Sequence, residues 1–535
     1  MKFDDLDGQD PSPQRLPEDF EYDVFVDLSA SGFGAAQVAQ HLKRLRREGG
    51  YDDASTSMSV ALPSRLDASQ DAALSFASED GPRTFVDSAR HAARRRRHLL
   101  VILGTAVPSN EAIASLLPIL AMDPLFGSVQ PRLADPLTDA LWPLFELPAS
   151  GRKPAMTSRD VLMRLPSVVV AAETLGPCML LRRELLTGID ATPGYESARG
   201  AILHALCMAR RKGFRTAISQ RAVVPVGAED GACAIPARAA AGHPAKNYPD
   251  HARATQENAR QPVKRLEALL SAAFPAHGAP RRLLLDCRGM GAMHNGTSQC
   301  ILGILEGLVQ VNDPRWKIDI WSSAVAAAFH ELPKRFPDFR HVHGPLQDAY
   351  AALLVPNQPW ALGTVLEHHG LALALVFNML DTIAWDVIYP SDDRVEPCWR
   401  YISKHADGLA YISAYTQDRF RVRFPVAPQV EERVVHLSLA RREYELPQVA
   451  GTPLEGHILV FGNSYDHKDL APTLDVLGEA FPLQEFVVLG GASKSARVRV
   501  IPSGRTSNED IHKLVASARA IVYPSYYEGF GLPVL

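Results

Sequence analysis

Apolar runs of strand length alternate with amphipathic segments along residues 1–226. Residues 111–121 place their apolar side chains at i, i+3, i+4 and i+7, the spacing of a helix with one buried face. Strands that alternate with helices are typical of a mostly parallel, doubly wound sheet, so we predict an α/β domain here. The predicted strands are 23–27, 58–62 and 98–103, and the predicted helices are 35–47 and 111–121.

The pattern changes between residues 227 and 280. This stretch is rich in Ala, Gly, Pro and charged residues, a composition that buries little apolar surface and is typical of a linker. Within it, residues 263–274 have a helical apolar stripe, which we expect to pack on a neighbouring domain. The stripe consists of Leu266, Leu269, Leu270 and Phe274.

The alternation of strands and helices resumes after residue 280, and it predicts two further Rossmann-like domains, 281–440 and 441–535. The predicted strands are 281–289, 316–321, 340–343, 371–381, 457–462, 485–491, 498–501 and 520–523. We expect Thr297 or Ser298, Ser413 and Ser507 to be helix N-caps. A further helix, 470–481, is expected to bury Leu470, Leu474, Leu477 and Phe481.

Composition narrows the functional classes. The 535 residues are 46% hydrophobic and 22% charged, and the net charge of -4 gives no general attraction to nucleic acid. No apolar run approaches the roughly 20 residues of a membrane span, and the acidic N-terminus predicts no signal peptide. The 6 cysteines include no Cys-x-x-Cys pair, a usage typical of a reducing compartment. We therefore expect a cytoplasmic protein.

The candidate chemistry is densest in residues 521–535, where an apolar strand leads into a Pro-Ser turn, a carboxylate and a Gly-Phe-Gly loop. Such an order places free backbone N–H groups at the carboxyl end of a parallel strand, where α/β proteins bind anions and nucleotides. The motif resembles the donor-sugar motif of family-4-type GT-B glycosyltransferases. The resemblance implies that Glu528, Gly529, Phe530 and Gly531 hold the sugar and phosphates. It also implies a second Glu one residue beyond Leu535, so the donor-binding domain is expected to be incomplete.

A second loop of this resemblance follows strand 457–462. In the family the loop carries basic residues that grip the donor diphosphate, and Lys468 matches the lysine of that motif. Asn463, after Gly462, stands where an Arg is frequent. The resemblance therefore implies that Gly462, Asn463 and Lys468 contact the donor. A lysine at a strand-to-helix turn is alternatively an exposed surface charge.

The predicted acceptor side lies in residues 281–440. The glycine-rich turn contains Gly289, Gly291 and Gly296, where the backbone can approach a ligand closely. Its spacing does not fit Gly-x-Gly-x-x-Gly, which argues against a nicotinamide cofactor. Asp381 ends an apolar strand, and two interpretations stay open: it orients an acceptor hydroxyl, or it caps a loop. Ser413 is assigned no chemistry beyond helix capping.

Residues 101–108, 122–131 and 176–184 resemble, in order and spacing, a family-2 GT-A glycosyltransferase. Such an enzyme needs a carboxylate motif for a divalent metal that neutralises the donor diphosphate. The corresponding turn here is Gly104-Thr105-Ala106, without a carboxylate. We therefore expect a catalytically silent GT-A-like domain that serves as a scaffold or an acceptor-binding module, and no metal site.

Taken together, the resemblances imply a retaining, metal-independent GT-B hexosyltransferase whose co-substrate is a nucleotide-sugar, with no other cofactor. Glu528, Lys468 and Asp381 are the expected catalytic residues. The expected acceptor is a glycan or a lipid-linked saccharide, in polysaccharide or surface-glycan assembly, with peripheral association at the inner face of the membrane. The 535 residues alone are expected to be inactive. The alternative hypothesis is a non-catalytic, glycan-binding scaffold.

Overall fold

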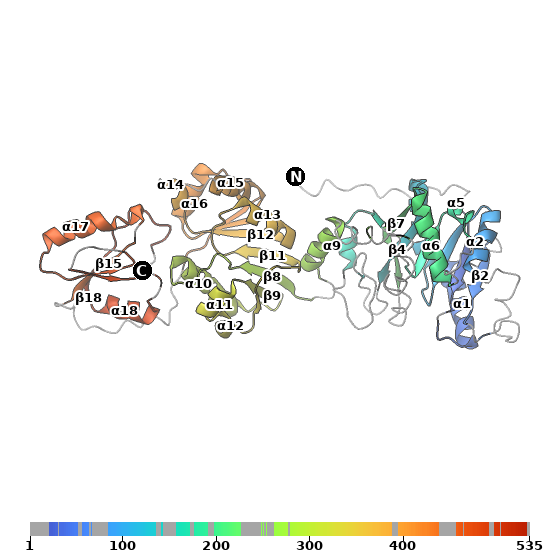
Figure 1. Cartoon of the computed structure of the whole chain (residues 1–535), viewed down its shortest axis with the longest axis horizontal. Helices are drawn as coiled ribbons and strands as arrows, with labels where there is room; N and C mark the ends of the chain where they lie inside the picture. The colour runs from blue at the N-terminus through green and yellow to red at the C-terminus, as the bar shows by residue number, and fades with distance from the viewer. Residues whose placement is uncertain are drawn as a thin grey trace. The chain divides into compact units, whose positions relative to one another are not determined.

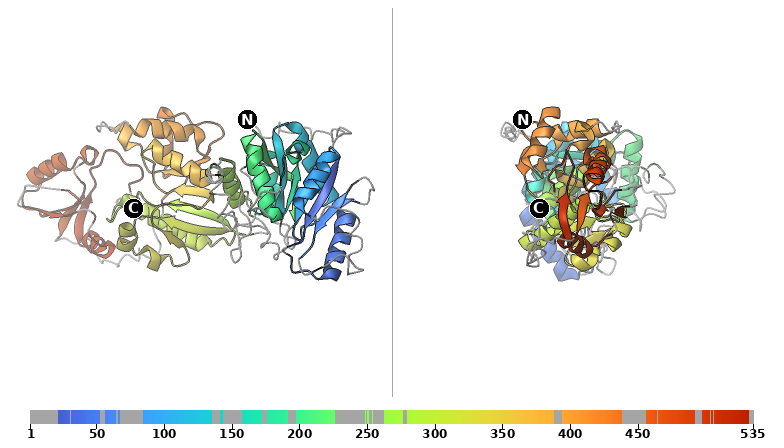
Figure 2. Two further views of the ribbon diagram at one scale, coloured as in Figure 1. Left: turned by 45° about the vertical axis from the view of Figure 1, so that its right-hand side comes forward. Right: turned by 90° about the vertical axis from the view of Figure 1, so that its left-hand side faces the viewer.

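The computed structural model divides the chain into two compact units, Met1–Ala279 and Pro280–Leu535. Its described residues form three separate β-sheets (Figures 1 and 2). The structure describes residues 21–29, 31–51, 56–63, 66, 84–134, 141–142, 157–171, 176–190, 197–225, 248, 250, 253, 262–275, 279–387, 394–437, 456–463, 465–491, 497–502, 504 and 506–531.

The first unit contains a seven-stranded sheet with the order β2-β1-β3-β6-β4-β7-β5. The expectation of a mostly parallel sheet is confirmed in part: β2, β1, β3, β4 and β7 share one direction. The sheet is mixed, because β6 runs antiparallel to both of its neighbours and β5 runs antiparallel to β7. The strands are β1 (Tyr22–Asp27), β2 (Met58–Ala61), β3 (His98–Leu103), β4 (Phe126–Ala134), β5 (Val168–Ala171), β6 (Cys178–Leu181) and β7 (Arg215–Pro225).

Helices cover both faces of this sheet, as the alternating pattern predicts. The core on one face contains residues of α1 (Ala35–Gly49) and α3 (Asn110–Met122). The core on the other contains residues of α2 (Phe85–Arg94), α5 (Arg183–Leu186) and α6 (Ala198–Arg211). A separate small core includes residues of the short helix α4 (Arg159–Leu162).

The helix predicted at 263–274 is confirmed as α9 (Pro262–Ala273). Its Leu270 packs in the same small core as Leu141 and Leu162. Glu267 of α9 forms a buried ion pair with Arg132 of β4 through two contacts. One joins Arg132 Nη2 to Glu267 Oε1, and the other joins Arg132 Nη1 to Glu267 Oε2 at 3.3 Å. The helix therefore belongs structurally to the first unit.

The second unit begins with a seven-stranded sheet of order β10-β9-β8-β11-β12-β13-β14, in which every pairing is parallel. Helices α10–α12 lie on one side of it and α13–α16 on the other (Figure 1). The strands are β8 (Arg281–Asp286), β9 (Trp316–Trp321), β10 (Arg340–Val342), β11 (Tyr350–Val355), β12 (Ala372–Met379), β13 (Gly408–Tyr411) and β14 (Glu431–Val434). The helices are α10 (Gly296–Val311), α11 (Ala324–Phe329), α12 (Leu332–Arg335), α13 (Leu362–Leu371), α14 (Ile383–Asp386), α15 (Val395–His405) and α16 (Ala414–Arg423).

One predicted cap in this part of the chain is wrong. Helix α10 is capped by Asn295, whose side chain accepts a hydrogen bond from Ser298 N at 2.8 Å, and not by Thr297 or Ser298. The extended backbone of Asn295, with φ -152° and ψ 174°, places it outside the helix, as an N-cap requires. Ser413 is confirmed as the N-cap of α16.

The third sheet is parallel and four-stranded, with the order β17-β16-β15-β18. Phe481, predicted to be buried, is 52% exposed, because the helix ends one residue before it. The predicted N-cap Ser507 is confirmed. The elements are β15 (His457–Phe461), η5 (Asp466–Lys468), α17 (Leu470–Ala480), β16 (Phe486–Leu489), β17 (Val498–Ile501), α18 (Asn508–Ala516) and β18 (Ala518–Val522).

Within the described part of the chain, no helix is both long and apolar enough to cross a membrane.

Candidate functional site

Lys468 and Glu528 meet at the carboxyl edge of the third sheet. Lys468 ends the short helix η5 after β15, and Glu528 lies in the segment after β18, the parallel neighbour of β15. Parallel neighbours end at the same edge, so the topology brings together two residues that are 60 positions apart. Lys468 Nζ donates to Glu528 Oε1, and the two side chains are 16% and 25% exposed.

Tyr523, directly after β18, lies beside this pair. Its hydroxyl is 3.5 Å from Lys468 Nζ, and the ammonium lies 5.5 Å from the centre of its ring. Burial acts to raise the pKa of the Glu528 carboxyl. Hydrogen bonds from Lys468, Ser525 and Tyr523 outweigh that effect, so the pKa lies below its ordinary value. Glu528 is therefore held as a carboxylate paired with the Lys468 ammonium.

The loop after Glu528 has unused hydrogen-bond donors. The amides of Gly529, Phe530 and Gly531 have no acceptor among the described residues. Gly531 has a φ of +86°, a left-handed conformation that favours glycine. Three consecutive free amides beside a carboxylate and an ammonium can bind the oxygen atoms of a polar, anionic ligand.

The predicted loop after β15 is built by local contacts. Asn463 Oδ1 accepts from Tyr465 N at 3.0 Å, so this side chain shapes the turn. Gly462 lies against α17, where an added Cβ would be 3.0 Å from Leu470 Cδ1. Burial first, and then the charge of Lys468, lower the pKa of His467, which favours a neutral imidazole. Lys468 therefore carries the positive charge of this loop.

Asp381 lies close to the same loop. An added Cβ at Gly529 would be 3.1 Å from Asp381 Cβ. Asp381 Oδ1 accepts from Ile383 N at 3.1 Å and from Gln358 Nε2 at 3.2 Å, the contacts of a loop cap. Burial raises the pKa of Asp381; the nearby Glu528 also acts to raise it. The loop-capping interpretation therefore has direct geometric support.

The three predicted glycines of the second unit's first loop are held by local contacts. Among the described residues, no hydrogen bond joins the 289–296 loop to Lys468 or Glu528. Gly289 packs on Asn357, the carbonyl of Gly291 lies 2.9 Å from His330 Nε2, and Gly296 is the first residue of α10. The loop reaches the third sheet's segment through His294 N, which donates to the carbonyl of Gly504 at 3.0 Å.

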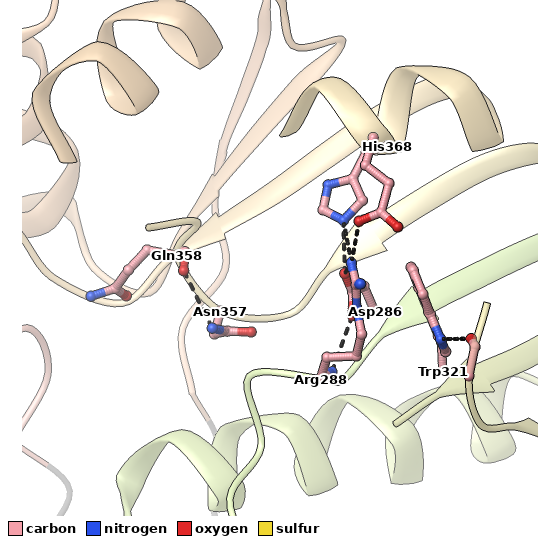
Figure 3. A network of polar contacts seen from close by, with 8 residues as sticks. Asp286, Arg288, Trp321, Asn357, Gln358 and His368 are labelled. Atoms are coloured by element: carbon pink, nitrogen blue, oxygen red, sulfur yellow. Dashed lines mark hydrogen bonds and ion pairs between the residues drawn. The ribbon is translucent and has the colours of Figure 1, made fainter. Parts of the chain in front are cut away.

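A polar network that the sequence did not indicate supports the start of this loop (Figure 3). His368 Nε2 is 2.7 Å from Asp286 Oδ2, and Arg288 Nη2 donates to the same oxygen at 2.7 Å. The Arg288 guanidinium stacks on Trp321, 3.4 Å from the ring centre. Burial acts to raise the pKa of Asp286, but bonds from His368 and Arg288 outweigh it and lower the pKa. The network fixes the backbone at the carboxyl end of β8.

The same view shows Asn357 and Gln358, which follow β11 (Figure 3). Gln358 accepts from Leu380 N at 3.1 Å and donates to Asp381, so it holds the Asp381 turn at two points. Neither residue belongs to a recognisable motif, and no sequence signal identifies them. Among the described residues, no cluster of three or more His, Cys, Asp or Glu has a metal-binding arrangement.

The described residues thus define an α/β protein with three parallel or mixed sheets and a polar, charge-paired site at the carboxyl edge of a parallel sheet. No protein-family model matches the sequence, and no curated protein matches it.

Solved structures of glycosyltransferases show a distant structural similarity over about half of the chain. A sucrose-phosphate synthase from Thermosynechococcus elongatus is 14% identical, with a TM-score of 0.36, over 47% of this chain and 77% of that chain. HepE from Anabaena, in complex with UDP and glucose, is 15% identical, with a TM-score of 0.35, over 47% of this chain and 76% of that chain. A TarM variant from S. aureus was solved in complex with Fondaparinux, alpha-GlcNAc-glycerol and UDP. It is 6% identical, with a TM-score of 0.34, over 47% of this chain and 82% of that chain. All three TM-scores lie below 0.5, so the function has to be argued from the residues of the site.

Proposed function

We propose that the second unit binds a nucleotide-sugar and transfers its sugar, with retention of configuration, to a glycan or lipid-linked acceptor. The observation that carries the proposal is the contact of Lys468 with Glu528 beside the amides of Gly529–Gly531, which have no acceptor among the described residues. A cation, a carboxylate and backbone donors at one strand edge suit a ligand that carries both phosphates and sugar hydroxyls.

The chemistry follows from the donors available. Cleavage of a nucleotide-sugar leaves a diphosphate, and the developing charge is stabilised by donors that are already oriented. The Lys468 ammonium has three N–H donors and contacts Glu528 and Tyr523, which leaves one for a phosphate oxygen. Glu528 accepts hydrogen bonds from sugar hydroxyls, and the loop amides add further phosphate donors. In this proposal the silent first unit is a scaffold or an acceptor-binding module.

A second candidate, binding without transfer, is favoured by one observation. Asp381, the residue expected to orient an acceptor, is engaged by Gln358 and the backbone of Ile383. In that case the site retains a nucleotide-sugar and produces no free nucleotide. The two candidates therefore differ in turnover and agree in binding.

The test uses the full-length protein and a panel of UDP-, GDP- and ADP-sugars, with calorimetric binding and release of free nucleotide as readouts. Lys468→Ala and Glu528→Ala should each lower turnover by about 100-fold, the effect of losing one charge-stabilising group. The matched control is the exposed pair Lys513 and Glu509 of α18, with 2.8 Å between Lys513 Nζ and Glu509 Oε1. Alanine at either control position should leave binding and turnover unchanged.

Three results separate the candidates. Binding with turnover that depends on Lys468 and Glu528 supports the transferase. Binding without any turnover supports the non-catalytic protein. Failure of the wild-type protein to bind any nucleotide-sugar, or full turnover by the Lys468→Ala/Glu528→Ala double variant, contradicts the proposed site.

A further inference from the structure

We propose that residues of the 281–440 segment position the loop that contains Glu528, so that donor binding at the third sheet depends on side chains outside that sheet. The inference rests on the proposed function and identifies three positioning residues, Ser413, Asp386 and Tyr527. None of the three is placed among the groups that touch the donor. Two sets of contacts hold the residues on either side of Glu528, and the two sets share no side chain.

The first set holds Gly529. Ser413 Oγ donates to the carbonyl oxygen of Gly529 at 2.6 Å, and Thr416 Oγ1 donates to the same oxygen at 3.3 Å. Ser413 Oγ also accepts from Thr416 N at 3.1 Å, as the N-cap of α16. A hydroxyl has one donor and two acceptor positions, so a single side chain can cap the helix and hold the loop.

The backbone that surrounds Gly529 leaves no room for a side chain at this position. A Cβ added there would lie 2.0 Å from the carbonyl oxygen of Leu380, a backbone atom after β12. A side chain at this position would force the loop away from Ser413. The loop therefore has one closely defined position against the 281–440 segment, not a loose contact.

The second set holds Tyr527, on the other side of Glu528. Tyr527 Oη donates to Asp386 Oδ2 at 2.6 Å and lies 2.8 Å from Thr382 Oγ1. Asp386 is itself fixed by Arg419, whose Nη2 donates to Oδ1 at 2.6 Å and whose Nε donates to Oδ2 at 3.2 Å. The Asp386 side chain is 3% exposed, so water competes little for these bonds.

Glu528 thus lies between two anchored neighbours, Tyr527 and Gly529. Neither anchor contacts the Glu528 carboxylate, which is held by Lys468 and Tyr523. The anchors instead fix the backbone from which the carboxylate and the loop amides project. A binding group displaced by about 1 Å loses much of its effect, so such anchors influence affinity without touching the ligand.

The experiment compares two tyrosines in matched surroundings. Tyr411 Oη donates to Glu432 Oε1 at 2.8 Å, and Arg421 holds Glu432 at 2.9 Å, so Tyr411→Phe removes the same kind of bond as Tyr527→Phe. Tyr411 lies within the 281–440 segment and has no hydrogen bond to the described residues of the loop. Tyr527→Phe should weaken nucleotide-sugar binding about 10-fold, about 1.4 kcal/mol, whereas Tyr411→Phe should leave binding unchanged.

The serine is tested by a conservative rescue. Ser413→Ala removes both the cap and the bond to Gly529, and Ser413→Thr retains a hydroxyl. Ser507→Ala removes a cap of the same kind on α18, where Ser507 Oγ accepts from Asp510 N at 3.1 Å. We expect weaker donor binding in Ser413→Ala, recovery in Ser413→Thr, and normal binding in Ser507→Ala.

A ligand-free measurement separates failure of this inference from failure of the proposed function. Hydrogen exchange of the peptide covering residues 523–531, measured on the full-length protein, should be faster in Tyr527→Phe and unchanged in Tyr411→Phe. If exchange changes as expected but no donor binds to the wild type, the positioning holds and the proposed function fails. Equal exchange in Tyr527→Phe and Tyr411→Phe overturns the inference. If the wild type binds a donor, equal donor affinity of the two variants also overturns it.

Discussion

Tyr523 contacts both members of the Lys468–Glu528 pair and is the least predictable residue of the candidate site. The sequence motif gave a reason to select Lys468 and Glu528, because each follows an apolar strand in a recognisable loop. Tyr523 only looks like the end of a strand, where aromatic residues are common. Its contact with Lys468 arises because β15 and β18 are neighbours, and local sequence does not show which of two distant strands will pair.

Tyr523→Phe should make stability less dependent on pH. The hydroxyl helps to hold the pKa of Glu528 below its ordinary value, and a carboxyl with a lowered pKa stabilises the fold only when ionised. That contribution is present above the unfolded pKa of about 4.3 and is lost as the pH falls through the lower native value. The variant should therefore lose about 1.5–3 kcal/mol at pH 7, the effect of one bond to a charged group, and much less near pH 3.

Calorimetric Tm values of wild type and variant, recorded between pH 3 and pH 7, measure this effect. The control is Tyr526→Phe, because Tyr526 is 64% exposed and its hydroxyl has no partner among the described residues. A Tm difference that stays constant over the pH range would contradict the link between Tyr523 and Glu528.

At the scale of elements, periodicity predicted most helices and strands, and strand direction was predicted only in part. Residues 98–103 and 498–501 were predicted with the observed limits, because apolar runs between turns define a buried strand. The directions of β5 and β6 could not be predicted in this way. Only six residues, 172–177, separate these two short apolar runs, too few for a crossover helix. A strand without its own helix can enter a sheet in either direction.

The N-cap of α10 is an error at this scale, and it gives a direct prediction. Asn295, Thr297 and Ser298 are all good capping residues, so composition does not choose between them. The structure chooses Asn295, because its side chain accepts from Ser298 N while Thr297 lies inside the helix. Asn295→Ala should cost about 1 kcal/mol. Thr297→Ala should not destabilise the helix, because Thr297 lies inside it and Ala has the higher helix propensity. The measurement is the calorimetric Tm of each variant. An equal fall in Tm for Asn295→Ala and Thr297→Ala would contradict Asn295 as the N-cap.

At the scale of the whole molecule, the composition of residues 227–280 predicts a linker. Composition alone does not show that helix α9 of this stretch packs into the first unit. Most of its neighbours in sequence suit a connector, but α9 carries an apolar stripe and one buried acid, Glu267, which is 2% exposed. A buried carboxylate requires a partner, and Arg132 supplies it from more than a hundred residues away. The sequence shows the stripe, but it contains no signal for the ion pair. The assignment of the remaining boundaries, at 226 and 440, stays a prediction.

Glu267→Gln should therefore destabilise the first unit far more than the loss of a surface charge would. Removing one partner of a buried ion pair leaves the other charge uncompensated and costs about 3–5 kcal/mol. The matched control is Glu48→Gln on α1, in the same unit, where Arg44 Nε and Glu48 Oε1 are 3.0 Å apart and Arg44 is 58% exposed. An exposed pair of this kind contributes about 0.3–0.5 kcal/mol. Calorimetry of the full-length protein should show a lower Tm for the first unit in Glu267→Gln and an unchanged Tm in Glu48→Gln. Equal Tm values would mean that α9 is a tethered helix of the linker and that the first unit is stable without it.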